Sequence, residues 1–107
     1  MTPPTKPFDV TVKEQLQKSA GFRRALLTEA VGCMISGDME TGKSVLRKYI
    51  NGTVGFIQLG KDLNRSPKVL MRMFSAKGNP QAKNLFEIVA HLQKLEGTKL
   101  EVVDRAA

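Results

Sequence analysis

The sequence predicts a mainly α-helical domain of five helices, followed by a short C-terminal β-strand. Apolar residues recur at steps of three and four over most of the chain, which is the spacing of one buried helix face. Glycine, asparagine and proline residues separate these segments at positions where helices end and begin. The chain has 107 residues, of which 41% are hydrophobic, as is typical of one globular domain.

The first helix is expected to follow an extended arm. Residues 1–10 contain three prolines, which lack a backbone N–H and disfavour helix, and they are predicted to form a flexible arm. The helical domain is expected over residues 11–97. Thr11 and Glu14 have the spacing of a capping box, which marks a helix start. Gly21 leaves open one bent helix or two short ones before Gly37 ends the segment. Its apolar stripe is formed by Leu16, Phe22, Leu26, Ala30 and Met34.

Four shorter helices are predicted next, over about 40–50, 54–62, 67–75 and 80–95. The pair Asn51-Gly52 closes the first of them. Ser66 and Pro67 have the residue types of an N-cap and a first helical position, and Asn79-Pro80 repeats this pattern. Gly97 ends the last helix. The expected inward residues of these helices are Val45, Leu46, Tyr49, Ile50, Phe56, Leu59, Leu63, Leu70, Met73, Phe74, Leu85, Ile88, Val89, Leu92 and Leu95.

The C-terminal segment 98–107 changes period and contains the predicted strand. Leu100 and Val102 alternate with their neighbours up to Asp104. The chain offers this strand no partner strand, so we expect a homodimer in which it can pair with the same strand of a second copy. The sequence leaves open whether the dimer forms through this strand or through the N-terminal helices.

Charge favours a polyanionic partner. The formal net charge is +7, and cationic surfaces bind nucleic acid because phosphate contacts release counterions. No apolar run is long enough to span a membrane, and the N-terminus lacks the layout of a signal peptide. The single Cys33 cannot form an internal disulfide and is expected to be a buried thiol. We therefore expect a cytoplasmic protein that does not bind membranes.

Residues 54–75 have the layout of a helix-turn-helix. The expected core residues of both helices leave Lys68 and Arg72 on the outer face of the second helix, where a recognition helix contacts base edges. Arg72 has the planar fork that reads guanine. From Phe56 to Phe86 the chain has six basic residues and one acid, a net +5. The predicted DNA-binding residues are Ser66, Pro67, Lys68, Val69, Met71, Arg72, Lys77 and Asn79.

Several motifs spread along the chain occur together in one known family. They are Phe22-Arg23-Arg24-Ala25-Leu26-Leu27, Gly37-Asp38-Met39-Glu40-Thr41-Gly42-Lys43, Arg47-Lys48-Tyr49-Ile50-Asn51, Pro67-Lys68-Val69-Leu70-Met71-Arg72-Met73, Lys77-Gly78-Asn79-Pro80, Asn84-Leu85-Phe86, His91-Leu92 and Leu100-Glu101-Val102. Through these motifs the sequence resembles the addiction-module antidote (antitoxin) family, over roughly residues 8–103. The resemblance implies a λ-repressor-like fold and a dimeric, DNA-binding prophage-type regulator that represses its own operon. It also implies a partner toxin of the RelE/ParE type in many members. The chain differs from the commoner family pattern at Asn64 and Pro67.

Two alternative functions remain at this stage. One is a module that neutralises a RelE/ParE-type toxin without specific DNA binding. The other is a nucleotide binder, because residues 37–44 match the P-loop pattern G-x-x-x-x-G-K-[S/T]. A P-loop requires a preceding strand, whereas the residues before Gly37 have helical spacing. Asp38 is better interpreted as a helix N-cap with acids in the first turn.

No enzyme activity is expected. His91 is the single histidine and Cys33 the single cysteine, so the chain offers neither a zinc ligand set nor a base with an evident partner. We therefore expect no catalytic residues, no metal and no cofactor.

Overall fold

The computed structural model describes residues 8–106, with side chains from residue 10 onward. These residues are mainly α-helical, as the sequence predicts, and they contain no β-strand. The helices are α1 (Phe8–Lys18), α2 (Ala20–Ile35), α3 (Met39–Gly52), α4 (Phe56–Leu63), α5 (Pro67–Met73) and α6 (Ala82–Glu96).

The structure corrects the N-terminal part of the prediction. The first helical segment is two helices, so the described chain has six helices and not five. The break lies at Ser19 rather than at Gly21, because the Ser19 hydroxyl caps α2 by accepting a 3.1 Å hydrogen bond from the Phe22 N–H. Thr11 lies inside α1 and does not start it. Residues 8–10 are helical, and the rest of the predicted arm, residues 1–7, lies outside the described residues.

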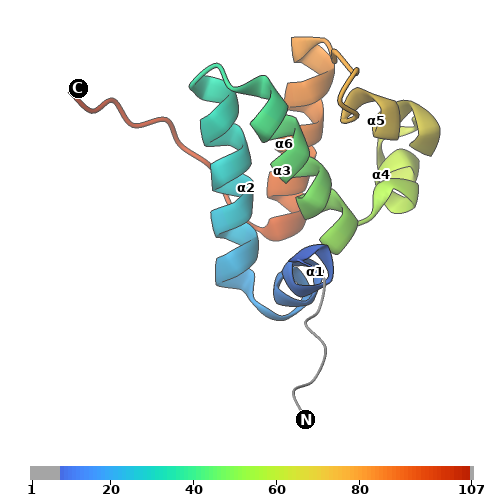
Figure 1. Cartoon of the computed structure of the whole chain (residues 1–107), viewed down its shortest axis with the longest axis horizontal. Coiled ribbons are helices and arrows are strands. Elements are labelled where there is room, and N and C mark those ends of the chain that lie inside the picture. The colour runs from blue at the N-terminus through green and yellow to red at the C-terminus, as the bar shows by residue number, and fades with distance from the viewer. Residues whose placement is uncertain (1–7, 107) are drawn as a thin grey trace.

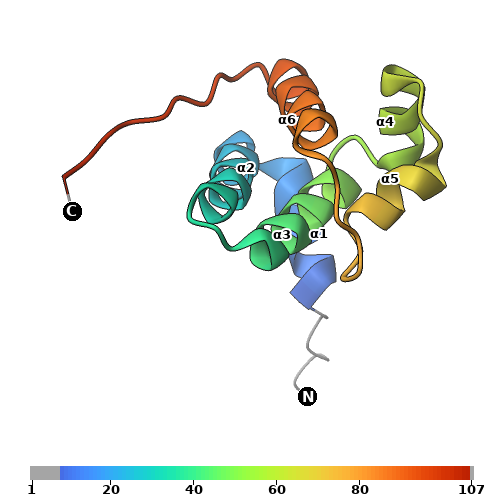
Figure 2. The same ribbon diagram turned by 90° about the horizontal axis from the view of Figure 1, so that it is seen from above.

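Helix α3 is the centre of the fold. It runs antiparallel beside α2, while α1 crosses the end of this pair and α6 packs behind it (Figures 1 and 2). The short helices α4 and α5 lie on the side of α3 opposite α2.

The core contains most of the residues that were predicted to face inward. Leu95 was predicted to face inward as well, but it is 53% exposed. The buried core comprises Val12, Leu16, Leu27, Ala30, Leu46, Tyr49, Ile50, Phe56, Leu59, Leu70, Phe74, Leu85, Ile88, Val89 and Leu92.

A polar network fastens α6 to α2 and α3. The buried carboxylate of Glu96 accepts a 2.9 Å hydrogen bond from the Tyr49 hydroxyl and a 2.9 Å hydrogen bond from Arg23 Nε. Arg23 also donates to the carbonyl oxygen of Leu16, 3.0 Å away. Burial, reinforced by the Glu96 carboxylate, raises the pKa of Tyr49, so the hydroxyl remains a donor. This network fixes the C-terminal end of α6 to α2 and α3.

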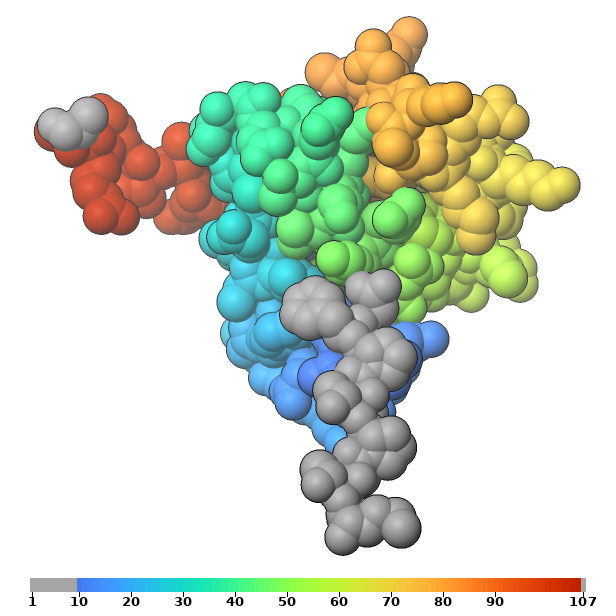
Figure 3. Space-filling model, in the orientation of Figure 1, coloured from blue at the N-terminus to red at the C-terminus, as the bar shows by residue number. Residues whose placement is uncertain are grey.

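The predicted C-terminal strand is not formed in the single chain. Residues 98–106 have no regular secondary structure, and the last part of this segment extends away from the helices (Figures 1 and 3). Leu100 packs against the core, and its N–H donates a 2.8 Å hydrogen bond to Gln93 Oε1. Beyond it, Val102 and Val103 are 83% and 79% exposed. A strand needs a second strand to satisfy its backbone groups, and the described residues supply none.

Candidate nucleic-acid interface

Helices α4 and α5 are joined by a tight turn of three residues, 64–66. Asn64 ends α4 in the left-handed conformation, at φ 54°, which asparagine tolerates better than most residues. The Arg65 N–H then donates a 2.8 Å hydrogen bond to the carbonyl oxygen of Gly60. Gly60 is buried at this crossing, where a Cβ atom would lie 2.6 Å from the Arg65 carbonyl oxygen. The absence of a side chain at Gly60 therefore permits the close approach of the turn.

Packing fixes the inner face of α5. Leu59 of α4 and Leu70 of α5 are fully buried. The rings of Phe56 and Phe74, also buried, have centroids 6.1 Å apart and planes inclined by 50°, which is a favourable aromatic arrangement. The opposite face of α5 is thereby held outward, at the edge of the molecule far from the C-terminal segment (Figure 3).

The outer face of α5 carries the predicted recognition residues. Lys68 and Arg72 are exposed, and their side chains have no hydrogen bond or ion pair with any described residue. Val69 and Met71 flank them and are 46% and 49% exposed. Ser66 is exposed at the start of α5 and Pro67 is half-buried at its first position. These six predicted site residues are therefore gathered on one short helix and its cap.

The remaining two predicted site residues lie in the loop after α5. Lys77 and Asn79 are both exposed. Asn79 and Pro80 do not start α6, contrary to prediction, because α6 begins at Ala82 and its N-cap residue is Gln81. The prediction for Ser66 was correct in position, since it is the N-cap residue of α5, but its hydroxyl accepts no capping hydrogen bond.

A buried lysine holds this loop in place. Lys43 of α3 is only 6% exposed, and its ammonium group donates hydrogen bonds of 3.1 Å to the Ser75 carbonyl and 2.6 Å to the Gly78 carbonyl. Gly78 packs so closely against the carbonyl oxygen of Arg72 that a Cβ atom would collide with it. The backbone on both sides of Lys77 is thus fixed to α3. Lys43 belongs to the P-loop-like motif of residues 37–44, and the spacing of that motif gave no indication of this positioning contact.

The same observations explain the P-loop-like sequence. Asp38 is the N-cap of α3 and accepts a 3.2 Å hydrogen bond from the Thr41 N–H, as predicted. Hydrogen bonding with the side chain of Thr41, and after it with the Thr41 backbone N–H, lowers the pKa of the Asp38 carboxyl. The motif follows helix α2 rather than a strand, and the Lys43 ammonium is occupied by carbonyl groups. The segment is therefore a capped helix start without the strand that a phosphate-binding loop requires.

Two contacts that the sequence did not reveal connect the α4–α5 unit to α6. Arg65 donates hydrogen bonds to Asn84 Oδ1 at 2.9 Å and to Glu87 at 3.3 Å, so its charge is partly compensated. His91 Nε2 lies 2.8 Å from Asp62 Oδ2. The hydrogen bond from His91 is the main cause that lowers the pKa of Asp62. No spacing signal joins residues 19 to 29 positions apart, so only the packed structure shows these pairs.

The segment 56–86 keeps an excess of exposed positive charge even though Arg65 is paired with Glu87. Among the described residues, the other basic side chains of the segment 56–86 have no hydrogen bond or ion pair. Each of them is exposed. They are Lys61, Lys68, Arg72, Lys77 and Lys83.

Other kinds of site find little support in the described residues. No cluster of three or more metal-ligating side chains occurs among them, and none of their helices has the length and apolar character of a membrane span. Cys33 is half-buried rather than buried, with Sγ 3.7 Å from Glu29 Oε1. Desolvation and the nearby carboxylates raise the pKa of its thiol, which disfavours the nucleophilic thiolate.

Comparison with known proteins adds no further constraint. No family model, no curated protein and no solved structure matches this chain. The functional inference therefore depends on the arrangement of the side chains themselves.

Proposed function

We propose that this protein is a sequence-specific, double-stranded DNA-binding transcriptional regulator that uses α4 and α5 as a helix-turn-helix. The observation that carries the proposal is the outer face of α5. Lys68 and Arg72 are exposed there and have no hydrogen bond or ion pair with any described residue, while the inner face is fixed by buried Leu70 and Phe74. A short, rigidly held helix with exposed cations suits insertion into the major groove.

Each predicted site residue has a role in this proposal. Arg72 reads a guanine through its O6 and N7 atoms. Lys68, with Ser66 and Pro67 at the helix start, contacts phosphate or base edges, while Val69 and Met71 supply apolar contacts such as a thymine methyl group. Lys77 and Asn79 contact the phosphate backbone, which positions the helix without reading sequence. The residues named for base contact are Lys68, Val69, Met71 and Arg72.

The resemblance to addiction-module antidotes extends the proposal to an autoregulating, cytoplasmic antitoxin that acts as a homodimer. The exposed Val102 and Val103 support dimerisation through the C-terminal segment. In this arrangement, residues 98–104 become a strand when a second copy supplies the missing backbone partners. Two recognition helices would then bind two half-sites of a palindromic operator.

One observation favours toxin neutralisation as a second candidate function. Ile35, Met39 and Phe86 are 63%, 38% and 58% exposed, and they line one mainly apolar hollow of about 240 Å³. Large exposed apolar side chains that cluster are typical of protein-binding surfaces. If the chain neutralises a toxin through this surface, Phe86→Asp should abolish co-purification with the toxin encoded by a neighbouring gene. Unchanged co-purification would remove this surface from the candidate function.

The main test is fluorescence anisotropy with a duplex from upstream of the gene and with a scrambled duplex, at about 0.15 M salt, where binding through charge alone is weak. The proposal predicts a preference of about a hundredfold or more for the upstream duplex. Equal, weak binding to both duplexes would contradict a sequence-specific regulator and favour a protein partner.

A further inference from the structure

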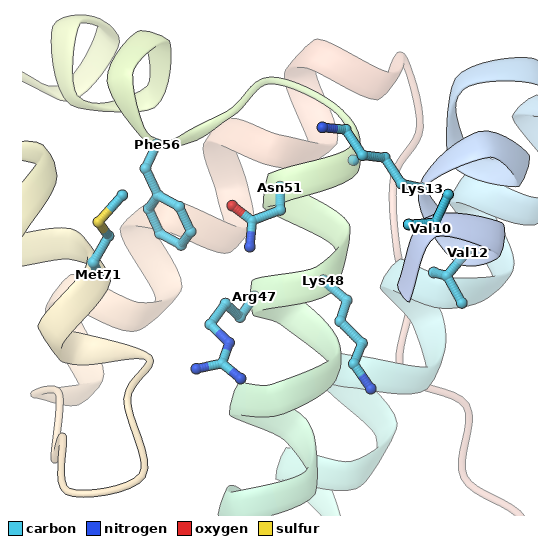
Figure 4. A pocket seen from close by; sticks show the side chains of 9 residues that line it. Val10, Val12, Lys13, Arg47, Lys48, Asn51, Phe56 and Met71 are labelled. Carbon is cyan, nitrogen blue, oxygen red and sulfur yellow. The ribbon is translucent and has the colours of Figure 1, made fainter. Parts of the chain in front are cut away.

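A groove of about 510 Å³ runs along α3, between α1 on one side and α4 and α5 on the other. Figure 4 shows Arg47 and Asn51 of α3 between Met71 of α5 and the side chains of Val10 and Lys13 on α1. Phe56 closes the groove at the start of α4. The groove therefore begins at the proposed recognition helix and leads away from it across the surface of α3.

The charge of this groove has one sign. Three of its lining residues are basic, namely Lys13, Arg47 and Lys48, and none is acidic. Arg47 and Lys13 are exposed, and neither side chain has a hydrogen bond or ion pair with a described residue. Asn51 is also exposed and adds an amide that can donate a hydrogen bond. A groove with these groups is complementary to an anion that can extend along it.

The position of Met71 relates the groove to the outer face of α5. Successive residues of an α-helix are about 100° apart, so Met71 flanks the face formed by Lys68 and Arg72. Met71 also lines the groove. If Lys68 and Arg72 point at base edges, the phosphates on one side of the major groove must pass along the flank of α5 that carries Met71.

We infer that the α1–α3 groove receives the phosphodiester backbone of one DNA strand beside the major groove, with Arg47 as the principal contact and Lys13 as the second. This inference rests on the proposed function and adds a phosphate-binding surface outside the α4–α5 unit. Arg47 positions the duplex and reads no base, because phosphate contacts are the same for every sequence.

The test compares Arg47→Ala with the parent protein and with the matched control Arg24→Ala. Arg24 is also an exposed helical arginine without a side-chain partner among the described residues, but it lies on α2 and does not line the groove. Both variants should unfold at the parent's temperature. Arg47→Ala should weaken binding to the upstream and the scrambled duplex alike, by about threefold or more. Its slope of log K against log salt concentration should decrease in magnitude by about 0.9, while Arg24→Ala keeps the parent's slope.

Ethylation of single phosphates in the upstream duplex locates the contact. Arg47→Ala should lose interference at one phosphate per half-site and keep the others. If the parent prefers the upstream duplex and Arg47→Ala retains its affinity, slope and interference pattern, the groove inference is wrong and the proposed function stands. If the parent binds both duplexes equally and Arg47→Ala still reduces the slope, the groove contacts phosphate but the sequence-specific function fails. Binding to neither duplex, even at low salt, would overturn both.

Discussion

The ammonium group of Lys43 donates a 2.6 Å hydrogen bond to the carbonyl oxygen of Gly78, 35 residues further along the chain. This contact connects the first turns of α3 to the loop that follows α5. Together with the bond from Lys43 to the Ser75 carbonyl, it fixes the backbone around Lys77. A charged group from the central helix thus determines where a proposed phosphate contact lies.

Replacing Lys43 by methionine tests this positioning role. Lys43→Met keeps most of the length of the side chain but removes the ammonium group that donates both hydrogen bonds, so the carbonyls of Ser75 and Gly78 lose their partner. We expect the free energy of unfolding in urea to fall by about 1–2 kcal/mol. Duplex binding should weaken as much as in Lys77→Ala, and the double variant should weaken little further. Lys94→Met, at an exposed lysine of α6, is the control, and equal behaviour of the two variants would refute the role.

Arg72→Ala tests the proposed recognition helix. Loss of the guanidinium should cost about 1–3 kcal/mol of binding free energy at the operator and relax specificity at one base position. The arginine is exposed and unpaired in the described chain, so stability should not change. Anisotropy titrations with duplexes that vary each base pair measure the effect. Parent-like binding would show that α5 does not read the sequence.

Lys77→Ala tests a phosphate contact and should give a different pattern. Because a phosphate contact is sequence-independent, we expect weaker binding to every duplex and a salt slope that is smaller in magnitude by about 1. The preference for the operator should stay the same. A loss of affinity confined to one operator sequence would contradict this role.

Gly60→Ala should destabilise the turn between α4 and α5. The new methyl group would lie 2.6 Å from the Arg65 carbonyl oxygen, so the backbone must move, at a cost of about 1–3 kcal/mol in unfolding free energy. Gly32→Ala in α2 is the matched control, because nothing lies within 4 Å of its added Cβ atom. It should be neutral or stabilise the protein by up to about 1 kcal/mol. Equal unfolding midpoints for the two variants in urea would show that the turn is not closely packed.

The contact between Asp62 and His91 predicts a dependence of stability on pH. The hydrogen bond from His91 lowers the pKa of Asp62, so folding favours its carboxylate. The resulting stability is complete above the ordinary aspartate pKa of about 3.9 and is lost as the pH falls through the lower folded pKa. In Asp62→Asn, urea unfolding should depend less on pH below about 4 than in the parent. Glu101→Gln in the exposed tail is the control, and an unchanged acid dependence in Asp62→Asn would contradict the prediction.

The helical architecture was predictable because its signals are local. Apolar spacing identified the inward residues of α3, α4 and α5, and the caps at Asp38 and Gly97 have the predicted positions. The prediction was wrong where the local pattern was ambiguous. Ser19 rather than Gly21 divides the first segment, and Gln81 rather than Asn79 precedes the last helix. In each case several neighbouring residues were able to start a helix.

The sequence by itself determined the helix periodicity, the excess of positive charge and the identity of the outward residues Lys68 and Arg72. These depend on contacts within three or four positions along the chain. Only the tertiary structure decided that Lys43 holds the loop around Lys77, that Arg65 is paired, and that Arg47 faces a groove beside Met71. These relationships join residues 19 to 35 positions apart, and their geometry is set by how whole helices pack, which no local pattern encodes.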